Sequence, residues 1–315
     1  MMDEERMARR VSIMEIERFA IHDGPGVRTL VFLQGCPLHC SWCSNPESQQ
    51  MRPHLLYLRN KCVGCGACVN ACPNQAITFN NHQPVFNRER CHTCQSCANV
   101  CLQNAIRFVG EEVSIGHIMD IIRRDKAYYA DSGGGVTVSG GEAFVQFNGL
   151  IDLLSACREE GIHTAVETSG QVQPEKIHQA LPLIDLFLFD IKHLDRTLLK
   201  KETGAHLDTV LNNLSFIAQN DPQKVIIRIP VIPGFNFNEN ETQFGQTAIL
   251  LIFELALKLK IKKIHLLPYH TLGKDKYEQM GLAYPFAYDR ILSKEALVPL
   301  KDTGEKMGLS VGIGG

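Results

Sequence analysis

Three closely spaced cysteines, Cys36, Cys40 and Cys43, constrain this chain more than any other feature. Thiolates in a C-x3-C-x2-C triplet can bind three iron atoms of a cubane 4Fe–4S cluster, whereas clusters that only carry electrons take four cysteines. The fourth iron then lacks a protein ligand, and an open position of this kind distinguishes catalytic from structural metal sites. A zinc or disulfide site is the alternative, but the triplet has no obvious fourth ligand. The sequence therefore predicts a cluster with one open iron.

Composition limits the partners and the compartment. The 315 residues include 32 basic and 34 acidic side chains, so the formal net charge of -2 indicates no bulk attraction to nucleic acid or anionic lipid. No apolar run is long enough to span a membrane, and residues 1–10 are too charged for a secretory signal. We therefore expect a cytoplasmic protein, in which most of the twelve cysteines are metal ligands. Cys157 lies in an apolar helical pattern and is expected to be a core residue.

Eight further cysteines form two runs with the same spacing, C-x2-C-x2-C-x3-C. Short turns surround both runs, and Asn-Gln-Ala-Ile at 74–77 returns as Gln-Asn-Ala-Ile at 103–106. This internal repeat sets residues 52–107 apart as a small inserted domain with little core of its own. A zinc ribbon is the alternative, but it expects two C-x2-C pairs well apart. The runs are Cys62, Cys65, Cys68 and Cys72, then Cys91, Cys94, Cys97 and Cys101.

The repeat resembles the bacterial two-cluster ferredoxins, in which the fourth cysteine of each run binds the cluster of the other run. The resemblance implies a ferredoxin-like α+β domain that two 4Fe–4S clusters keep folded. The implied ligand sets are Cys62, Cys65 and Cys68 with Cys101, and Cys91, Cys94 and Cys97 with Cys72.

Outside this segment, short β-branched runs alternate with longer amphipathic patterns, as in parallel βα units. Six such units are too few for a closed eight-stranded barrel, so the sequence predicts the α/β class and a partial (β/α)6 TIM-like barrel built from 11–51 and 108–315. Helices are expected at 148–160, 207–219 and 242–260, among others. The expected strands are 27–33, 135–138, 163–167, 186–190, 225–230 and 263–267.

Polar or glycine-rich groups follow the carboxyl ends of nearly all the expected strands. In βα barrels this end carries the active site. Chance would scatter such residues over both ends, so we expect these groups to meet in one site. They occupy 36–43, 139–142, 167–170, 190–192, 233–234 and 268–270.

The motifs together resemble the radical S-adenosylmethionine (SAM) enzymes, and more closely the activating enzymes of glycyl radical enzymes. The resemblance covers nearly the whole chain, and segment 52–107 is similar to the subclass that serves dehydratases, lyases and decarboxylases. The activator of pyruvate formate-lyase lacks such a segment. Besides the triplet, the matching motifs are Asp23-Gly24-Pro25-Gly26-Val27-Arg28, Ser139-Gly140-Gly141-Glu142, Asp190-Ile191-Lys192, Ile232-Pro233-Gly234-Phe235-Asn236 and Leu267-Pro268-Tyr269-His270 with Leu272-Gly273-Lys274.

This resemblance implies an oxidoreductase whose cofactors are SAM and three 4Fe–4S clusters. SAM chelates the open iron through its amino and carboxylate groups. One electron from a donor such as flavodoxin or ferredoxin then cleaves SAM to methionine and a 5′-deoxyadenosyl radical. That radical removes a hydrogen from one glycine of a partner glycyl radical enzyme. The clusters of segment 52–107 would relay electrons or serve in docking.

The same resemblance assigns the triplet to the catalytic cluster and implies individual SAM contacts. Glu142 would accept a hydrogen bond from the methionyl ammonium. Glu167 and Thr168 stand where relatives bind a monovalent cation, although glutamate replaces the expected aspartate. His22 and Arg228 are candidates to line the entrance for the partner's glycine. The implied cofactor-binding residues are Trp42, Cys43, Ser44, Gly140, Gly141, Glu142, Asp190, Ile191, Lys192 and His270.

Plainer interpretations stand beside these assignments. Trp42 could be a packed core aromatic residue, His270 a structural histidine, and the Gly-Gly-Glu sequence only a turn after a strand. Two other functions stay open: a radical SAM enzyme that acts on a small molecule, and an electron-transfer iron–sulfur protein fused to a scaffold.

Overall fold

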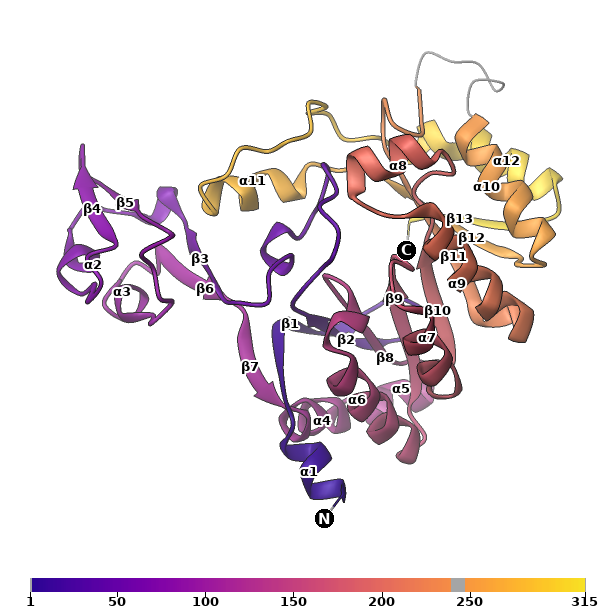
Figure 1. Cartoon of the computed structure of the whole chain (residues 1–315), viewed down its shortest axis with the longest axis horizontal. Helices are drawn as coiled ribbons and strands as arrows, with labels where there is room; N and C mark the ends of the chain where they lie inside the picture. The colour runs from indigo at the N-terminus through magenta and orange to yellow at the C-terminus, as the bar shows by residue number, and fades with distance from the viewer. Residues whose placement is uncertain (1, 239–246, 315) are drawn as a thin grey trace.

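The computed structural model describes residues 2–238 and 247–314, and its main feature is a curved nine-stranded sheet (Figure 1). The strand order is β13-β12-β11-β10-β9-β8-β2-β1-β7. All six expected strands are present, parallel and neighbours in chain order, with ends within two residues of expectation. The predicted α/β class and partial barrel are confirmed. The six strands are β2 (Arg28–Leu33), β8 (Gly135–Gly140), β9 (His163–Thr168), β10 (Leu186–Asp190), β11 (Val225–Val231) and β12 (Lys263–Pro268).

Three strands of this sheet were not expected. β13 (Ser310–Ile313) adds a parallel strand beside β12, whereas β1 (Arg10–Ala20) and β7 (Glu111–Ser114) run antiparallel at the other edge. β7 and β13 have four residues each, too few to show a period. β1 carries the exposed charged residues Glu15, Glu17 and Arg18 near one end, and these residues interrupt the alternation of apolar and polar side chains that marks a strand.

Helices cover the outer face of the sheet (Figure 1). The helices expected at 148–160 and 207–219 are α6 and α9. Of the helix expected at 242–260, residues 242–246 lie outside the described residues, and α10 forms 247–258 and ends two residues early. Within the described ranges no helix is both long and apolar enough to cross a membrane. The helices of the barrel are α1 (Met2–Ala8), α4 (Ile115–Arg124), α5 (Lys126–Ser132), α6 (Phe147–Glu159), α7 (Pro174–Ala180), α8 (Arg196–Thr203), α9 (Leu207–Asn220), α10 (Thr247–Lys258), α11 (Leu272–Gln279) and α12 (Val298–Lys306).

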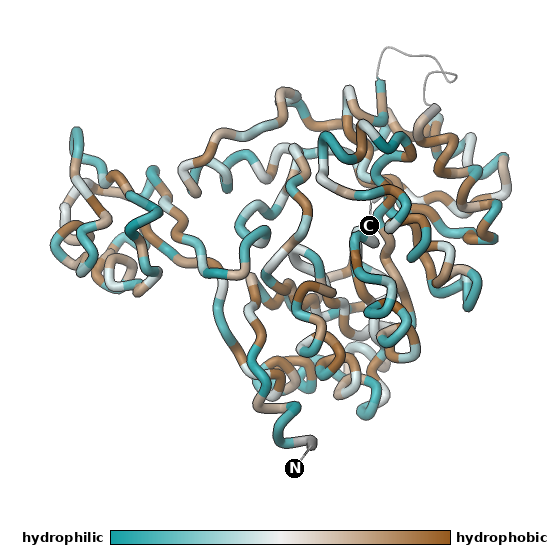
Figure 2. Tube along the Cα trace, in the orientation of Figure 1, coloured by the Kyte–Doolittle hydropathy of each residue, from teal (hydrophilic) through white to brown (hydrophobic). Residues whose placement is uncertain are grey.

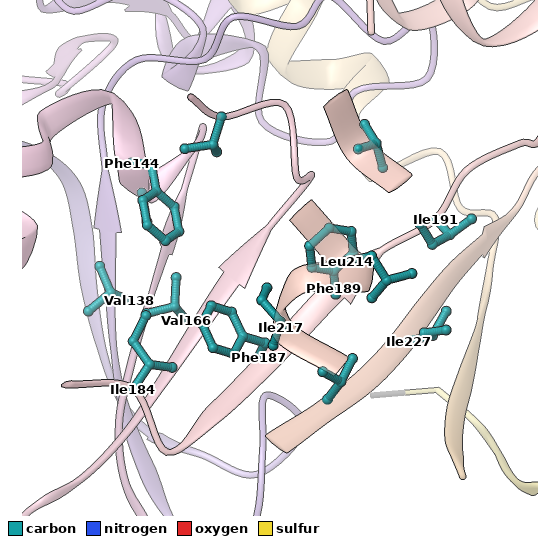
Figure 3. Packing of buried hydrophobic residues seen from close by; sticks show 14 of the residues in the cluster. Val138, Phe144, Val166, Ile184, Phe187, Phe189, Ile191, Leu214, Ile217 and Ile227 are labelled. Carbon is teal, nitrogen blue, oxygen red and sulfur yellow. The ribbon is translucent and has the colours of Figure 1, made fainter. Parts of the chain in front are cut away.

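The main core lies between the sheet and these helices. Phe187, Phe189 and Ile227 point outward from β10 and β11, where Leu214 and Ile217 of α9 pack over them (Figure 3). Figure 2 shows hydrophobic residues concentrated along the strands and along α10. Strands that are buried on both faces become nearly continuous apolar runs, as the Leu-Phe-Leu-Phe sequence of β10 illustrates.

The inner face of the sheet places polar side chains at the carboxyl ends of the strands. Leu188 and Ile226 belong to a separate apolar cluster, which is formed by the residues that alternate with the outward-facing ones. Because the side-chain period of a strand is two residues, Asp190 and Arg228 continue on the same inner face, and Glu167 does so on β9. The polar residues therefore meet where each strand ends.

Segment 52–107 projects from one side of the barrel and has its own small core (Figure 1). Two antiparallel strand pairs and two single-turn helices form it. Leu55, Cys68, Ile77, Cys97 and Ile106 are buried together there. Its elements are β3 (His54–Tyr57) paired with β6 (Ile106–Val109), β4 (Ile77–Asn80) paired with β5 (Gln83–Phe86), α2 (Ala67–Asn70) and α3 (Ser96–Asn99).

Candidate active site

A cavity of about 350 Å³ opens at the carboxyl ends of the barrel strands. Ten of the predicted site residues line it, from segments as far apart as 36–44 and 270. The cavity is also lined by the inner-face charges of β9, β10 and β11. The ten residues are Cys36, Cys40, Trp42, Cys43, Ser44, Gly140, Gly141, Asp190, Lys192 and His270.

Backbone hydrogen bonds from two directions hold the cysteine loop. The amide of Cys36 donates to the carbonyl of Gln49 (3.1 Å). The amide of His39 donates to the carbonyl of Thr203, at the end of α8 (3.0 Å). The amide of Cys43 donates to the carbonyl of Cys40 (3.0 Å), which closes a turn between these two cysteines. The loop is therefore fixed at both ends by the barrel.

Burial controls the protonation of the triplet. It raises the pKa of Cys36 and of Cys40 to about 12, and it also raises the pKa of Cys43. The neutral thiol is favoured at neutral pH, although the thiolate is the form that binds metal. Binding of a metal centre here would therefore release protons, and the positive charge of the metal would stabilise the thiolates.

The Gly-Gly turn brings the end of β8 into contact with the start of the cysteine loop. A Cβ on Gly140 would lie 2.0 Å from the carbonyl oxygen of Leu33, and Gly140 has a φ of +122°. A Cβ on Gly141 would lie 2.3 Å from the carbonyl oxygen of Gly35. The amide of Gly141 donates to the carbonyl oxygen of Leu33 (2.9 Å). Only glycine permits this backbone-to-backbone approach.

Two predicted cofactor contacts do not line the cavity. Glu142 is buried, and its carboxylate accepts hydrogen bonds from the Thr168 hydroxyl (2.9 Å), the Ser169 amide (2.9 Å) and the Ser169 hydroxyl (2.6 Å). Burial raises the pKa of Glu142, and the bonds from Ser169 and Thr168 oppose that rise. Glu142 thus shapes the loop after β9, and its bond to a ligand ammonium stays a prediction. Ile191 is buried, and its amide donates to the carbonyl of Arg228 (2.9 Å).

The charged groups of the cavity form two ion-paired sets. Lys192 Nζ lies 2.6 Å from Asp190 Oδ2, and Arg228 Nη1 lies 3.1 Å from Asp23 Oδ1 and 3.3 Å from Glu167 Oε1. Burial alone would lower the pKa of Lys192 and of Arg228, but the facing carboxylates outweigh it and raise both. Both cations therefore stay charged. Asp190 Oδ1 and Arg228 Nε are buried without a hydrogen-bond partner, so each has bonding capacity for a polar ligand.

The entrance residues expected from the sequence separate in the structure. Arg228 lines the cavity and binds Asp23 of the Asp-Gly-Pro-Gly motif, whereas His22 is exposed and is not among the cavity-lining residues. The second oxygen of Glu167 accepts a hydrogen bond from Ser139. The Glu167 carboxylate, a predicted ligand of a monovalent cation, is therefore already bound by the Arg228 guanidinium and the Ser139 hydroxyl.

An aromatic wall surrounds Trp42. This side chain is only 7% exposed, and its ring lies 4.6 Å from the ring of Phe235 and 6.0 Å from that of Phe286, between centroids. Phe286 in turn contacts Tyr269, whose hydroxyl lies 2.9 Å from that of Tyr284. Trp42 is therefore both a packed aromatic residue and part of the cavity wall.

Helix α11 braces the cysteine loop from the other side. A Cβ on Gly273 would lie 2.4 Å from the carbonyl oxygen of Cys43. One turn further on, Lys276 Nζ donates to Asn45 Oδ1 (2.7 Å) and to Glu47 Oε1 (2.6 Å). Sequence reasoning missed Lys276 and Glu47, because nothing in the local pattern marks a pair separated by 229 residues.

The cysteines of segment 52–107 gather in two groups that cross the two runs. Among the described residues, no group of three or more His, Cys, Asp or Glu side chains is spaced to hold a single metal ion. The cysteines thus meet as cavity linings, and their binding of clusters stays a prediction. One cavity of about 340 Å³ is lined by Cys62, Cys65, Cys68 and Cys101, and a smaller one by Cys72, Cys91, Cys94 and Cys97.

Cys157 lies outside this segment. It is buried against Met119, as expected of a core residue.

Comparison with known families and proteins agrees with this geometry. Residues 30–243 match the family model of the radical SAM superfamily. The chain is 40% identical over 288 residues to the choline trimethylamine-lyase activating enzyme of Oleidesulfovibrio alaskensis, covering 90% of this chain and 92% of that protein.

Two further relatives are similar over most of their length. The 4-hydroxyphenylacetate decarboxylase activating enzyme of Clostridioides difficile is 37% identical, with 96% of this chain and 95% of that protein covered. The (2S)-3-sulfopropanediol sulfolyase activating enzyme of Bilophila wadsworthia is 42% identical, with 86% and 89% covered.

Gly141→Ala should loosen the cysteine loop. The added Cβ forces the Gly35 carbonyl away, and such overpacking costs about 1–3 kcal/mol of unfolding free energy. We expect faster amide hydrogen exchange across residues 35–45. Gly161→Ala is the control, because no atom lies within 4 Å of its added Cβ; its left-handed backbone costs about 1–2 kcal/mol, but the loop should exchange as before. Equal loop exchange in both variants would contradict this role of Gly141.

Lys276→Met should leave the buried Glu47 carboxylate with an unmet hydrogen bond. An unsatisfied buried acceptor costs about 1–3 kcal/mol, so the unfolding free energy should fall by that amount. Adding Glu47→Gln should recover part of the loss, as measured in a double-mutant cycle by chemical denaturation. Lys274→Met on the exposed side of the same helix is the control and should change stability by less than about 0.5 kcal/mol. Additive effects of the two substitutions would argue against the coupling.

Proposed function

This chain belongs to the radical SAM superfamily and, within it, to the activating enzymes of glycyl radical enzymes, and on this premise we propose that the barrel cavity is where it acts on a partner's glycine. The family's reaction uses SAM and a 4Fe–4S cluster. The observation that carries the proposal is the convergence of the cysteine triplet, the Gly-Gly turn and the Asp190–Lys192 pair on one cavity.

The residues present suit these cofactors. Cys36, Cys40 and Cys43 would hold three irons, and the amino and carboxylate groups of SAM would take the fourth. When bound and reduced, the cluster supplies the electron that cleaves the sulfonium of SAM. The donor set is all thiolate, which is the ligand class that iron–sulfur clusters take, and the unpartnered Asp190 Oδ1 offers an acceptor for a polar ligand.

The chain's own side chains would orient SAM and exclude water. Lys192 keeps its positive charge in the cavity and would attract the SAM carboxylate, while the backbone of Gly140 and Gly141 allows close approach. Trp42 would pack near the adenine, and His270 would contact the ribose, since both line the cavity. These groups bind and position the cofactor, and the cofactor supplies the reactive chemistry.

The substrate would be a glycine in a loop of a partner enzyme. Glycine has no Cβ to obstruct approach, and it tolerates backbone conformations closed to other residues. The named relatives activate lyases and a decarboxylase, so a partner of the glycyl radical class is what their resemblance supports. We place the protein in the cytoplasm, where thiols remain reduced.

We propose two further clusters in a ferredoxin-like domain formed by 52–107. The cysteine groups that line its two cavities are the ligand sets implied by the crossed pairing of bacterial ferredoxins. α2 lies at the far end of the molecule's long axis and α3 nearer the barrel (Figure 1). Electrons from a flavodoxin or ferredoxin would therefore pass first to the cluster of Cys62, Cys65, Cys68 and Cys101 beside α2. From there they would pass to the cluster of Cys72, Cys91, Cys94 and Cys97 beside α3, and on towards Cys43.

The reaction itself is testable with purified protein. Anaerobically reconstituted chain, reduced with dithionite and given SAM, should form methionine and 5′-deoxyadenosine, and a candidate partner should acquire a glycyl radical doublet in electron paramagnetic resonance. Cys40→Ser should abolish both, because it removes one cluster ligand. Cys157→Ala should retain both, because Cys157 lies in the core of α6. Undiminished SAM cleavage by Cys40→Ser would refute the assignment.

The relay can be tested at one exposed ligand. With a reduced protein carrier as donor, Cys65→Ala should abolish turnover, because the cluster beside α2 loses one of its four ligands. Asn70→Ala, an exposed substitution in the helix α2 that follows Cys65, should leave the rate unchanged. Full turnover by Cys65→Ala would mean that the two clusters of this domain lie outside the electron path.

A further inference from the structure

Basic charge is concentrated in segment 52–107. Outside it, the chain has 26 basic and 33 acidic side chains. Within it, Glu89 is the single acidic residue, so its basic residues are not neutralised locally. All but one of these basic residues are exposed, and the segment is a positive extension on a negative body. They are Arg52, Arg59, Lys61, Arg88, Arg90 and Arg107, of which Arg88 is half-buried.

Exposed apolar side chains surround one of the two cysteine cavities of this segment. Leu102 is 93% exposed and Val63 67% exposed, and Phe79 and Val100 are also exposed. All four line the cavity that Cys62, Cys65, Cys68 and Cys101 share. Contiguous exposed apolar surface marks an interaction site more often than chance.

Two of the exposed cations stand at the edge of this apolar surface. Arg59 and Lys61 lie in the short 3-10 helix that leads directly into Cys62. The ligand Cys65 is itself exposed. We call the surface formed by Arg59, Lys61, Val63, Val100 and Leu102 the outer face. It has an apolar centre, a basic edge and a cysteine cavity directly beneath.

The outer face lies away from the barrel. Its neighbour α2 is at the end of the molecule's long axis, whereas α11 lies between this segment and the rest of the barrel (Figure 1). A partner's glycine must reach the barrel cavity, so an enzyme presenting that glycine has no need of the outer face. A protein that only delivers electrons does not need to approach the barrel.

We propose that the outer face is the docking surface for a small acidic protein that carries a one-electron redox group, a proposal that rests on the function given above. The carrier would lose one electron to a cluster held by Cys62, Cys65, Cys68 and Cys101, and no atom would be transferred. The basic edge attracts the acidic carrier during encounter, and the apolar centre forms the close contact. The docked carrier leaves the barrel cavity free for the partner enzyme.

Charge reversal tests this surface by binding. The probe is a purified acidic flavodoxin, titrated into the reconstituted full-length protein by calorimetry. Arg59→Glu/Lys61→Glu should raise its Kd about tenfold at an ionic strength of about 0.02 M, and the difference should shrink at about 0.5 M as charges are screened. Lys262→Glu/Lys306→Glu makes the same change in net charge at exposed barrel sites and should alter Kd less than twofold. Leu102→Ser should also weaken binding, at both salt concentrations.

Each outcome separates this proposal from the function beneath it. If dithionite supports SAM cleavage equally in all variants while flavodoxin-driven cleavage falls only in the outer-face variants, the docking surface is supported. Equal flavodoxin affinity in the charge-reversed and wild-type proteins overturns the docking proposal and leaves the proposed function intact. If the outer-face variants transfer the radical to the partner enzyme less well but bind flavodoxin with unchanged affinity, the outer face belongs to that enzyme, and the docking proposal is overturned as well. No SAM cleavage by the wild type with dithionite contradicts the proposed function itself.

Discussion

The cavity depends on a contact between two pieces of backbone. The ends of β2 and β8 approach so closely that Gly140 and Gly141 leave no room for a Cβ against Leu33 and Gly35. This contact fixes where the cysteine loop leaves the sheet. The hydrogen bonds that Cys36 donates to Gln49 and His39 donates to Thr203 of α8 then only hold the loop in a direction that is already set. The position of the three thiols is therefore determined mainly by the contact between the ends of β2 and β8, and less by the loop itself.

A second level of organisation comes from the register of the strands. Apolar inner-face residues give way to Glu167 and Asp190 at the last inward positions of β9 and β10, and to Arg228 at the last inward position but one of β11. The same two-residue period that builds the core thus also delivers the charges. Because Arg228 is held between Asp23 and Glu167, its guanidinium keeps its positive charge in spite of its burial.

Much of this architecture was predictable because parallel βα units leave a strong local signal. The apolar runs of β10 and β11 gave their positions nearly to the residue, and the cysteine spacing gave the triplet. The pairing of individual side chains from distant segments was not predictable. The Arg228–Asp23 pair spans 205 residues, and no pattern in either segment names its partner. Glu142 shows a different limit of prediction. Its Gly-Gly-Glu motif was evident in the sequence, but the motif did not indicate that the carboxylate binds the loop after β9.

Burial of the triplet also bears on how the chain survives before it acquires iron. A thiol whose pKa is about 12 is ionised on the order of once in 10⁵ molecules at neutral pH, and only the ionised form reacts readily with oxidants or alkylating agents. Cys36 and Cys40, which are half-buried in the cavity wall, are thus kept mostly in the less reactive thiol form. Cys94 is the contrast: it is exposed, and its hydrogen bond with Ser96 lowers its pKa. Oxidative damage to newly made chains should begin in the projecting segment and reach the barrel last.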